Sequence, residues 1–467
     1  MTNITEYYLL HHLESVLILL LIFVVAYTIA KTSILRRLYL PVALVAGIII
    51  LAVGPQVLGR WHPELALPAD FYTTWAPLPG VLINIVFACL FLGHPALKLR
   101  QMWSLSGRQI AFGQMVAWGQ YLVGGLVALL LLIPLFGDTP LVASLLEISF
   151  EGGHGTVAGL TPVFNDLGFH DGAAMANGLA TLSLVSALII GIILINWGHR
   201  RGHAEKTQPL IHREKQRFYH YTIIHRIHLQ YKEMHDRRLT VRKLVRHAFL
   251  VMLSLGLGFG IRAILIAIED ATWGQAGVKV FGYVPAFSIC LFGGLIVNKL
   301  CYRLGVRISM TANSLISTLS LGILIMTAVG TMSLEFFRQP NLAASFWILF
   351  VAGAIWILAA VLILARRIFT RYWFHNAMIS FGQAMGMTAT GLLFAQMLDP
   401  KNRTGAVEAF GYKQMLFEPL MGGGLVTAMS MPLILLLGLP LFTLICGVIA
   451  VGWFLAGIFY FRRLSFE

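Results

Sequence analysis

Two glycine-rich stretches carry the residues whose types and spacing best suit the binding of a small solute or ion. The first reads LLEISFEGGHGTVAGLTPVF over 145–164, and the second reads SFGQAMGMTATGLLFAQML over 380–398. Glycines let a chain turn sharply and let a ligand approach the backbone closely. A helix that begins after such a turn offers free N–H groups and a positive dipole end, which suit a carboxylate. The sequence shows no nucleophile–base pair and no cofactor motif, so we expect binding rather than catalysis.

The candidate substrate-binding residues gather around the glycines of both stretches. His154 could donate a hydrogen bond to a substrate oxygen, and Thr156 adds a hydroxyl group. The bland alternative for the first stretch is a packing site with a satisfied histidine, and for the second stretch a polar helix interface. The predicted set is Gly152, Gly153, His154, Gly155 and Thr156 in the first stretch, and Gly386, Thr388, Thr390 and Gln396 in the second.

Two carboxylates are predicted ion ligands. Glu151 directly precedes the glycines, where it could ligate sodium or carry a proton. Glu418 lies in LFEPLMGGG, beside a proline and three glycines, although it would be only a surface charge if its helix began later. Carboxylates inside a membrane are costly and usually functional. Glu147 is expected instead at the aqueous mouth of the first stretch. Sodium is the only metal expected, and no other cofactor is expected.

The elements that position these residues are expected to be membrane-spanning helices. The 467 residues are 58% hydrophobic and 12% charged, whereas soluble domains carry roughly 25% charged residues. Apolar runs of about 20 residues predict spans, because a helix of that length crosses the hydrocarbon core. The four cysteines lie inside such runs and are expected to be packing residues. The predicted spans are 13–30, 40–58, 79–97, 109–136, 172–197, 247–268, 281–298, 311–334, 341–365, 412–435 and 437–461.

The distribution of basic residues decides how the two glycine-rich stretches enter the membrane. Treating 141–163 and 374–397 as re-entrant hairpins places 30 of the 34 Lys and Arg residues in loops on one side, Lys413 among them. Basic residues collect in cytoplasmic loops. This predicts a multi-pass protein of the plasma (inner) membrane, with the N-terminus outside and both the 198–246 loop and the C-terminus cytoplasmic.

The net charge of +14 is therefore attributed to topology. No aromatic–basic module that would indicate a nucleic-acid partner is present. Within the basic loop, Ile224, Ile227, Tyr231 and Met234 recur at helical spacing, which predicts an amphipathic helix on the anionic inner leaflet.

The hairpins divide the chain into matching halves. We predict a first repeat over 1–197, a cytoplasmic loop over 198–246, a second repeat over 247–435, and an additional C-terminal helix with a tail over 436–467. Five spans separate the starts of the repeats, so the second is inverted. Interrupted segments at corresponding places of inverted repeats indicate a transporter binding site. The predicted fold class is an all-α integral membrane protein, an inverted-repeat secondary transporter with two re-entrant hairpins and about 11 transmembrane helices.

The string EGGHGTVAGLTPVF, followed by LGFHDGAAMANGLATLSL, resembles the hairpin and following helix of bacterial sodium:glutamate symporters. Weaker likenesses, such as YLPVALVAG at 39–47 and VPAFSICLFGGLIVN at 284–298, extend over nearly all of both repeats. The resemblance implies a homodimeric symporter that imports glutamate with sodium. The chain departs from the family pattern at Gly382 and Gln383, which replace a His-Cys pair, at Gly391, which replaces a proline, and at Thr427, which replaces an aspartate.

These observations predict sodium-coupled symport of glutamate or a similar small carboxylate, held between the two hairpin tips. Proton-coupled transport of another organic acid or amino acid, through Glu151 or Glu418, remains an alternative. An alternative of another class is a non-transporting receptor or scaffold that signals through the 198–246 loop. The expected partners are the carboxylate substrate, Na⁺, membrane lipid and a second copy of the chain.

Overall fold

The computed structural model describes residues 2–32, 41–93, 99–203, 240–276, 281–399 and 404–461. Within these ranges the chain forms helices and loops without a β-strand, which confirms the predicted all-α class. The amphipathic helix predicted around residues 224–234 lies outside the described residues.

The helices run in chain order along two halves, one before and one after residues 204–239. The first half holds α1 Thr2–Thr32, α2 Val42–Ala52, α3 Ala69–Trp75, α4 Leu78–Cys89, α5 Leu99–Val127, α6 Ile133–Phe136, α7 Leu145–Phe150, α8 Gly153–Asp166 and α9 Gly172–Arg200. The second half holds α11 Val241–Ala271, α12 Ala286–Arg303, α13 Met310–Gly330, α14 Pro340–Ala359, α15 Ala365–Ile368, α16 Trp373–Leu398, α17 Ala406–Phe417, α18 Leu425–Leu437 and α19 Leu439–Leu455.

Nine stretches of helix in the described residues are long and apolar enough to cross a membrane. They match nine of the eleven predicted spans. The other two predictions are wrong as continuous helices. The predicted span 40–58 holds only the short α2, which ends before Gly54 and Pro55. The predicted span 412–435 is interrupted between α17 and α18, where Pro419 precedes two glycines with positive φ, Gly422 and Gly423.

Local chemistry explains several helix ends. The hydroxyl of Ser309 accepts a hydrogen bond from the N–H of Ala312 at the start of α13, which satisfies a donor that the helix itself leaves free. Pro340 begins α14 at a position where its missing N–H costs nothing. Gly438, with a φ of 77°, makes the turn between α18 and α19.

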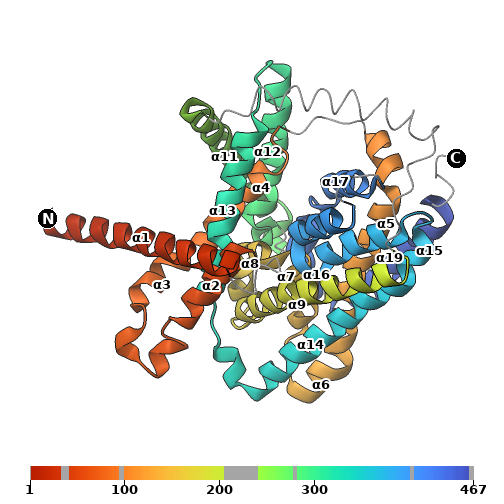
Figure 1. Ribbon diagram of the computed structural model, residues 1–467, viewed down its shortest axis with the longest axis horizontal. Coiled ribbons are helices and arrows are strands. Elements are labelled where there is room, and N and C mark those ends of the chain that lie inside the picture. The colour runs from red at the N-terminus through yellow and green to blue at the C-terminus, as the bar shows by residue number, and fades with distance from the viewer. Residues whose placement is uncertain are drawn as a thin grey trace.

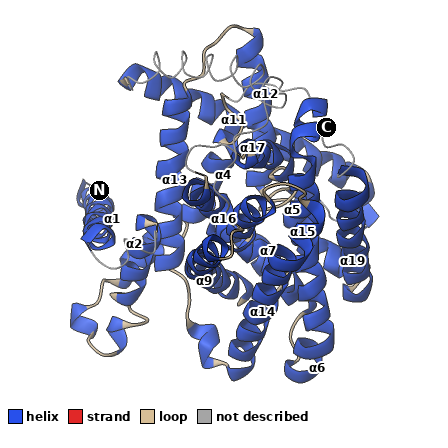
Figure 2. Cartoon of the chain, turned by 45° about the vertical axis from the view of Figure 1, so that its right-hand side comes forward, coloured by secondary structure: helices blue, strands red, loops and turns tan. Residues whose placement is uncertain are grey.

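The helices gather into two bundles that each combine both halves of the chain (Figure 1). In the first bundle α1–α4 pack with α11–α13. In the second bundle α5–α9 pack with α14–α19. Figure 2 shows the same division from another side, with α7 and α16 inside the second bundle. Apolar side chains of α1 and α19, such as Leu21 and Leu444, are 63% exposed, which suits a lipid-facing surface.

Helix α16 folds back on itself. Its backbone leaves helical geometry at Gly386 and at Met387, whose φ is 69°. The two arms then pack closely: a Cβ added at Gly382 would lie 2.6 Å from the backbone nitrogen of Gly391, and the rings of Phe381 and Phe394 stack at 6.1 Å. The segment predicted as a hairpin over 374–397 is therefore a tight helical hairpin with its tip at 386–387.

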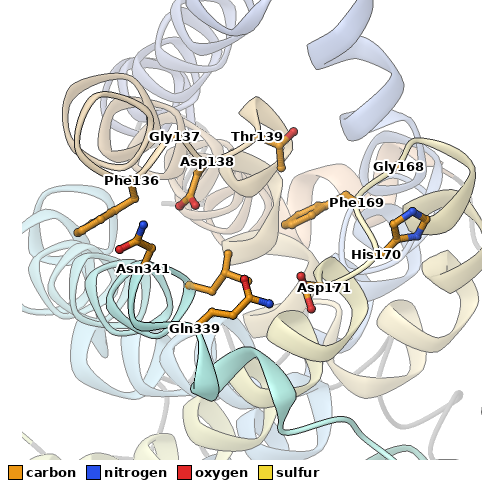
Figure 3. A pocket seen from close by; sticks show the side chains of 11 residues that line it. Phe136, Gly137, Asp138, Thr139, Gly168, Phe169, His170, Asp171, Gln339 and Asn341 are labelled. Atoms are coloured by element: carbon orange, nitrogen blue, oxygen red, sulfur yellow. The ribbon is translucent and has the colours of Figure 1, made fainter.

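The segment from Thr139 to Gly168 also returns to the end of the molecule from which it starts. It contains α7 and α8, separated by a break at Glu151–Gly152. Thr139 and Gly168 line one pocket of about 330 Å³, together with Gln339 at the start of α14 (Figure 3). Helices α7 and α8 both pack against α9, but their other neighbours differ. Gly353 of α14 adjoins Phe150 of α7, whereas α8 adjoins α4 and α12.

Corresponding features recur in the two halves of the chain. A π-helical segment extends α5 at Ala128–Leu132, and another extends α14 at Ala360–Leu364. Each lies shortly before one of the two helix breaks. Amide side chains also satisfy corresponding helix ends: Asn313 donates to the carbonyl oxygens of Cys89 and Leu92 after α4. Gln56 similarly donates to the carbonyl oxygen of Met332 after α13, at 3.1 Å.

Candidate functional site

The two helix breaks meet in space. A Cβ added at Gly153 would lie 2.5 Å from the sulfur of Met387, so the backbone of the first break touches the tip of the α16 hairpin. Both residues have positive φ, 69° in each case. These two breaks are far apart in sequence but adjacent in space. We call the region where they meet the break site and define it as residues 151–156, 386–390 and 418–424.

Two helix N-termini open at the break site. Helix α8 begins at Gly153, and the second arm of α16 begins at Thr388. The first N–H groups of a helix lack partners within the helix, and its N-terminus carries a partial positive charge. Two such ends, each beside the Gly153–Met387 contact, form an arrangement suited to two anionic groups of one small molecule.

Glu147 is fully buried, so its predicted place at an aqueous mouth is wrong. One carboxylate oxygen accepts hydrogen bonds from the N–H of Gly422 at 2.9 Å and from the hydroxyl of Thr427 at 2.8 Å. The other accepts from the hydroxyl of Tyr121 at 2.6 Å. These three donors satisfy a carboxylate that burial would otherwise penalise, and they tie α7 to the turn between α17 and α18.

Glu151 and Glu418, the two predicted ion ligands, both lie beside Gly422. A Cβ added at Gly422 would lie 3.8 Å from Cγ of Glu151 and 3.7 Å from Oε2 of Glu418. Glu418 accepts hydrogen bonds from Thr388 at 2.8 Å and from Gln414 at 2.6 Å. Oε2 of Glu151 is buried without a hydrogen-bond partner among the described residues. The structure thus brings the two carboxylates and predicted Thr388 into one cluster.

Lys413 lies in a very different environment from the inner loop predicted for it. Its charge was counted with the inner loops, but the side chain is fully buried in α17. Its amine donates to the side-chain oxygen of Gln383 and lies 3.6 Å from the ring centroid of Phe417. The signal was present in the sequence, since Lys413 lies five residues before Glu418 in an otherwise apolar run.

His154 is also fully buried, at the start of α8. Its Nε2 lies 2.9 Å from the hydroxyl of Thr181, which itself donates to the carbonyl oxygen of Asn177. Because that hydroxyl proton is used, Nε2 of His154 is the donor, and Nδ1 is left as an acceptor without a partner among the described residues. In this tautomer the free nitrogen suits an ammonium group rather than the substrate oxygen expected from the sequence.

The remaining predicted residues divide between the break site and its walls. The hydroxyl of Thr156 donates to the carbonyl oxygen of Gly152 at 3.0 Å and lies 3.5 Å from that of Gly422. Gly155 faces Ile83 of α4, where an added Cβ would lie 2.7 Å away. Thr390 donates to the carbonyl oxygen of Gly386, so its hydroxyl serves its own helix arm. The side chain of Gln396 lies outside the described set.

The comparison with known families follows this geometry. The sequence model of the sodium/glutamate symporter family matches residues 8–400, a range that includes both helix breaks. No curated protein gives a significant match.

Proposed function

The chain belongs to the sodium/glutamate symporter family, and from that premise we propose that it imports glutamate or a similar small dicarboxylate, driven by a sodium gradient. The family match and the nine long apolar helices of the described residues support a multi-pass membrane protein that acts as a transporter. The substrate, the coupling ion and the site are our proposal. Transport of this kind requires binding and conformational change, without a covalent step.

The contact between Gly153 and Met387 is the observation that carries the proposal. It brings the N-terminal ends of α8 and of the second arm of α16 to one place. Main-chain donors and helix dipoles bind carboxylates without an arginine, and transporters commonly use interrupted helices for this purpose. A molecule with two carboxylates can engage both ends at once, whereas a monocarboxylate can engage one.

We assign sodium to the side of the break site where Glu151 and Glu418 flank Gly422. Hard cations prefer oxygen ligands. The buried, unpartnered Oε2 of Glu151 offers an anionic oxygen, and the carbonyl groups of the 418–424 turn offer neutral ones. A bound cation would also offset the repulsion between these carboxylates and an anionic substrate.

The membrane arrangement proposed here is an inverted repeat of residues 1–197 and 247–435 with two re-entrant hairpins. It is supported by the paired π-helical segments, by the two helix breaks that follow them, and by the return of each broken segment to its starting end. Irregular backbone inside a membrane needs shelter from lipid. Both breaks have it, because Glu151 and Met385, which adjoin them, are buried.

We further propose that the protein is a homodimer of the plasma (inner) membrane, with its N-terminus outside and its 198–246 loop and C-terminus in the cytoplasm. The asymmetry of basic loops supports the orientation. An impermeant thiol reagent added outside intact cells should label a cysteine placed at Asn3 and spare one placed at His203. Equal labelling of both positions would contradict the proposed orientation.

Uptake by purified protein in liposomes tests the function directly. With sodium outside and a matched internal potassium solution, labelled glutamate should accumulate, and unlabelled diacids should compete better than monocarboxylic amino acids. Neutral sugars should have no effect. Uptake driven by a pH gradient alone would favour the proton-coupled alternative, and the absence of uptake with every substrate would favour the receptor or scaffold.

A further inference from the structure

Lys413 carries a buried ammonium group that fits closely among its neighbours. Its side chain is fully buried, and the amine contacts Gln383 of α16 and the ring of Phe417. Helix α5 makes room for it: a Cβ added at Gly113 would lie 2.5 Å from Cε and 2.8 Å from Nζ of Lys413. Burying a charge costs several kcal/mol unless other groups compensate it. A lysine in such a place therefore requires an electrostatic reason.

The compensating charges are the two carboxylates of the break site. Glu418 directly follows α17, the helix that carries Lys413, and Glu151 lies beside Glu418 at Gly422, so two carboxylates share the buried region of the amine. Neither forms a direct ion pair with it within 4.0 Å. The amine is instead held by a neutral amide and an aromatic face, at a distance from which it acts on both carboxylates without occupying their oxygens.

A charge count shows what this arrangement does. Glu151 and Glu418 contribute two negative charges and Lys413 contributes one positive charge, so one further monovalent cation makes the cluster neutral. The third buried carboxylate, Glu147, accepts hydrogen bonds from three neutral donors, Tyr121, Thr427 and the N–H of Gly422. Its own negative charge is the same with or without Lys413, so it does not alter the difference of one cation that the lysine makes. Without the lysine, the same two carboxylates would require two mobile cations.

We propose that Lys413 is a tethered cation, which does permanently for Glu151 and Glu418 what one bound coupling ion would otherwise do in each transport cycle. The inference rests on the proposed function. Lys413 then acts as a positioning residue, which supplies a fixed positive charge and does not contact the substrate. The number of mobile cations that bind depends on whether this buried amine is present.

The test counts cations with three variants of the purified protein. Lys413→Met removes the charge while keeping a side chain of similar length, and it should bind one more sodium ion or proton than the wild type. Glu151→Gln should bind one fewer, and the double variant should return to the wild-type number. Lys299→Met, at an exposed lysine of α12, is the matched control and should change nothing.

The cation number is read from thermal unfolding in detergent at several sodium concentrations and two pH values. A ligand that binds only the folded state stabilises it in proportion to the number bound, so the slope of stability against the logarithm of sodium concentration counts the ions. This readout requires no transport. If Lys413→Met does not fold, the double variant, whose net charge matches the wild type, still provides the comparison with Glu151→Gln.

The proposal is overturned if Lys413→Met and wild type show the same sodium and proton slopes. It is also overturned if the variant only raises the glutamate concentration needed for half-maximal uptake, since that would make Lys413 a substrate ligand. Failure of the proposed function has a different signature: the wild type itself would show no stabilisation by sodium or by protons, and no uptake.

Discussion

At the scale of single residues, the site depends on a carboxylate supplied from an unexpected helix. The family resemblance leads one to expect an aspartate where Thr427 stands. The hydroxyl of Thr427 donates to Glu147 at 2.8 Å, so a carboxylate from α7 lies beside that position. The residue type at position 427 differs from the family pattern, but negative charge is still present in the same region of the site.

Replacing Glu147 should therefore destabilise the protein. Glu147→Gln places an amide, which includes N–H donors, against the three donors Tyr121, Thr427 and the N–H of Gly422. We expect a loss of about 1–3 kcal/mol in the free energy of unfolding, measured by thermal or denaturant unfolding in detergent. Thr427→Val removes two hydrogen bonds, the one donated to Glu147 and the one accepted from the N–H of Gly423, and should also cost about 1–3 kcal/mol. Full stability of Glu147→Gln would show that this network contributes nothing.

The positive φ of Gly153 allows a second prediction with a matched control. Gly153→Ala is destabilised by the left-handed backbone conformation at this position, and its added methyl group also clashes with Met387. Gly168 has a similar φ of 75°, but no atom of the described residues lies within 4 Å of an added Cβ. Gly168→Ala therefore loses only about 1–2 kcal/mol of stability, from its backbone conformation. Uptake by Gly153→Ala should be lost while Gly168→Ala transports normally. Equal uptake by the two variants would remove the break contact from the mechanism.

At the scale of elements, the α16 hairpin depends on glycines where its arms cross. Gly382→Ala places a methyl group 2.6 Å from the backbone nitrogen of Gly391. Such overpacking should lower the free energy of unfolding by about 1–3 kcal/mol. At Gly411, in α17, no atom of the structurally described part of the chain lies within 4 Å of an added Cβ, and alanine there should gain up to about 1 kcal/mol from helix propensity. The two substitutions should thus shift the melting temperature in opposite directions. A shift in the same direction would contradict the close packing of the arms.

Many of the helices could be predicted from the sequence, because long apolar runs indicate segments in lipid and charged segments indicate loops in water. The break before Gly153 lies at the predicted glycines, and Gly153 has a positive φ that other residues avoid. At the tip of the α16 hairpin the positive φ belongs to Met387, which the glycine spacing does not indicate. The interruption after α17 could not be predicted in the same way. The run around Glu418 is apolar enough to read as one span, and only the fold shows that Gly422 and Gly423 turn there.

The burial of Glu147 and Lys413 also escaped prediction, for a related physical reason. A charged residue near the end of an apolar run is cheaply placed in water, so the sequence favours that interpretation. The hydrogen-bond partners that stabilise the buried side chains come from helices distant in sequence. Tyr121 of α5 donates to Glu147, and Gln383 of α16 accepts from Lys413. Such partners are fixed by tertiary packing, which no local pattern encodes.

At the scale of the whole molecule, the break site lies where the two bundles meet. Helix α8 belongs to the second bundle, and an added Cβ at Gly159 would lie 2.2 Å from the ring of Phe287 in α12 of the first. Ser288 likewise reaches the carbonyl oxygen of Gly423 at 3.3 Å. Any conformational change that exposes the site to one side of the membrane must therefore alter the contact between the bundles.

Wedging the bundles apart should impair transport. Gly159→Leu inserts a bulky side chain against Phe287, and we expect uptake to fall at least about tenfold, the equivalent of about 1.4 kcal/mol. Gly256→Leu, in α11, places the same side chain at a position where no described residue lies within 4 Å of an added Cβ, and its uptake should match the wild type. The comparison uses initial rates in liposomes at equal amounts of folded protein. Similar uptake by both variants would mean that the α8–α12 contact is not part of the transport cycle.

The central claim is that glutamate and sodium bind where the two helix breaks meet, and protection of Met387→Cys from a thiol reagent tests it most directly. The four native cysteines are buried, whereas Met387 is only partly buried at the hairpin tip. We predict that sodium and glutamate together slow its labelling severalfold, while a cysteine at the exposed Tyr302 reacts at an unchanged rate. Labelling of Met387→Cys at the same rate with and without both ligands would contradict the claim.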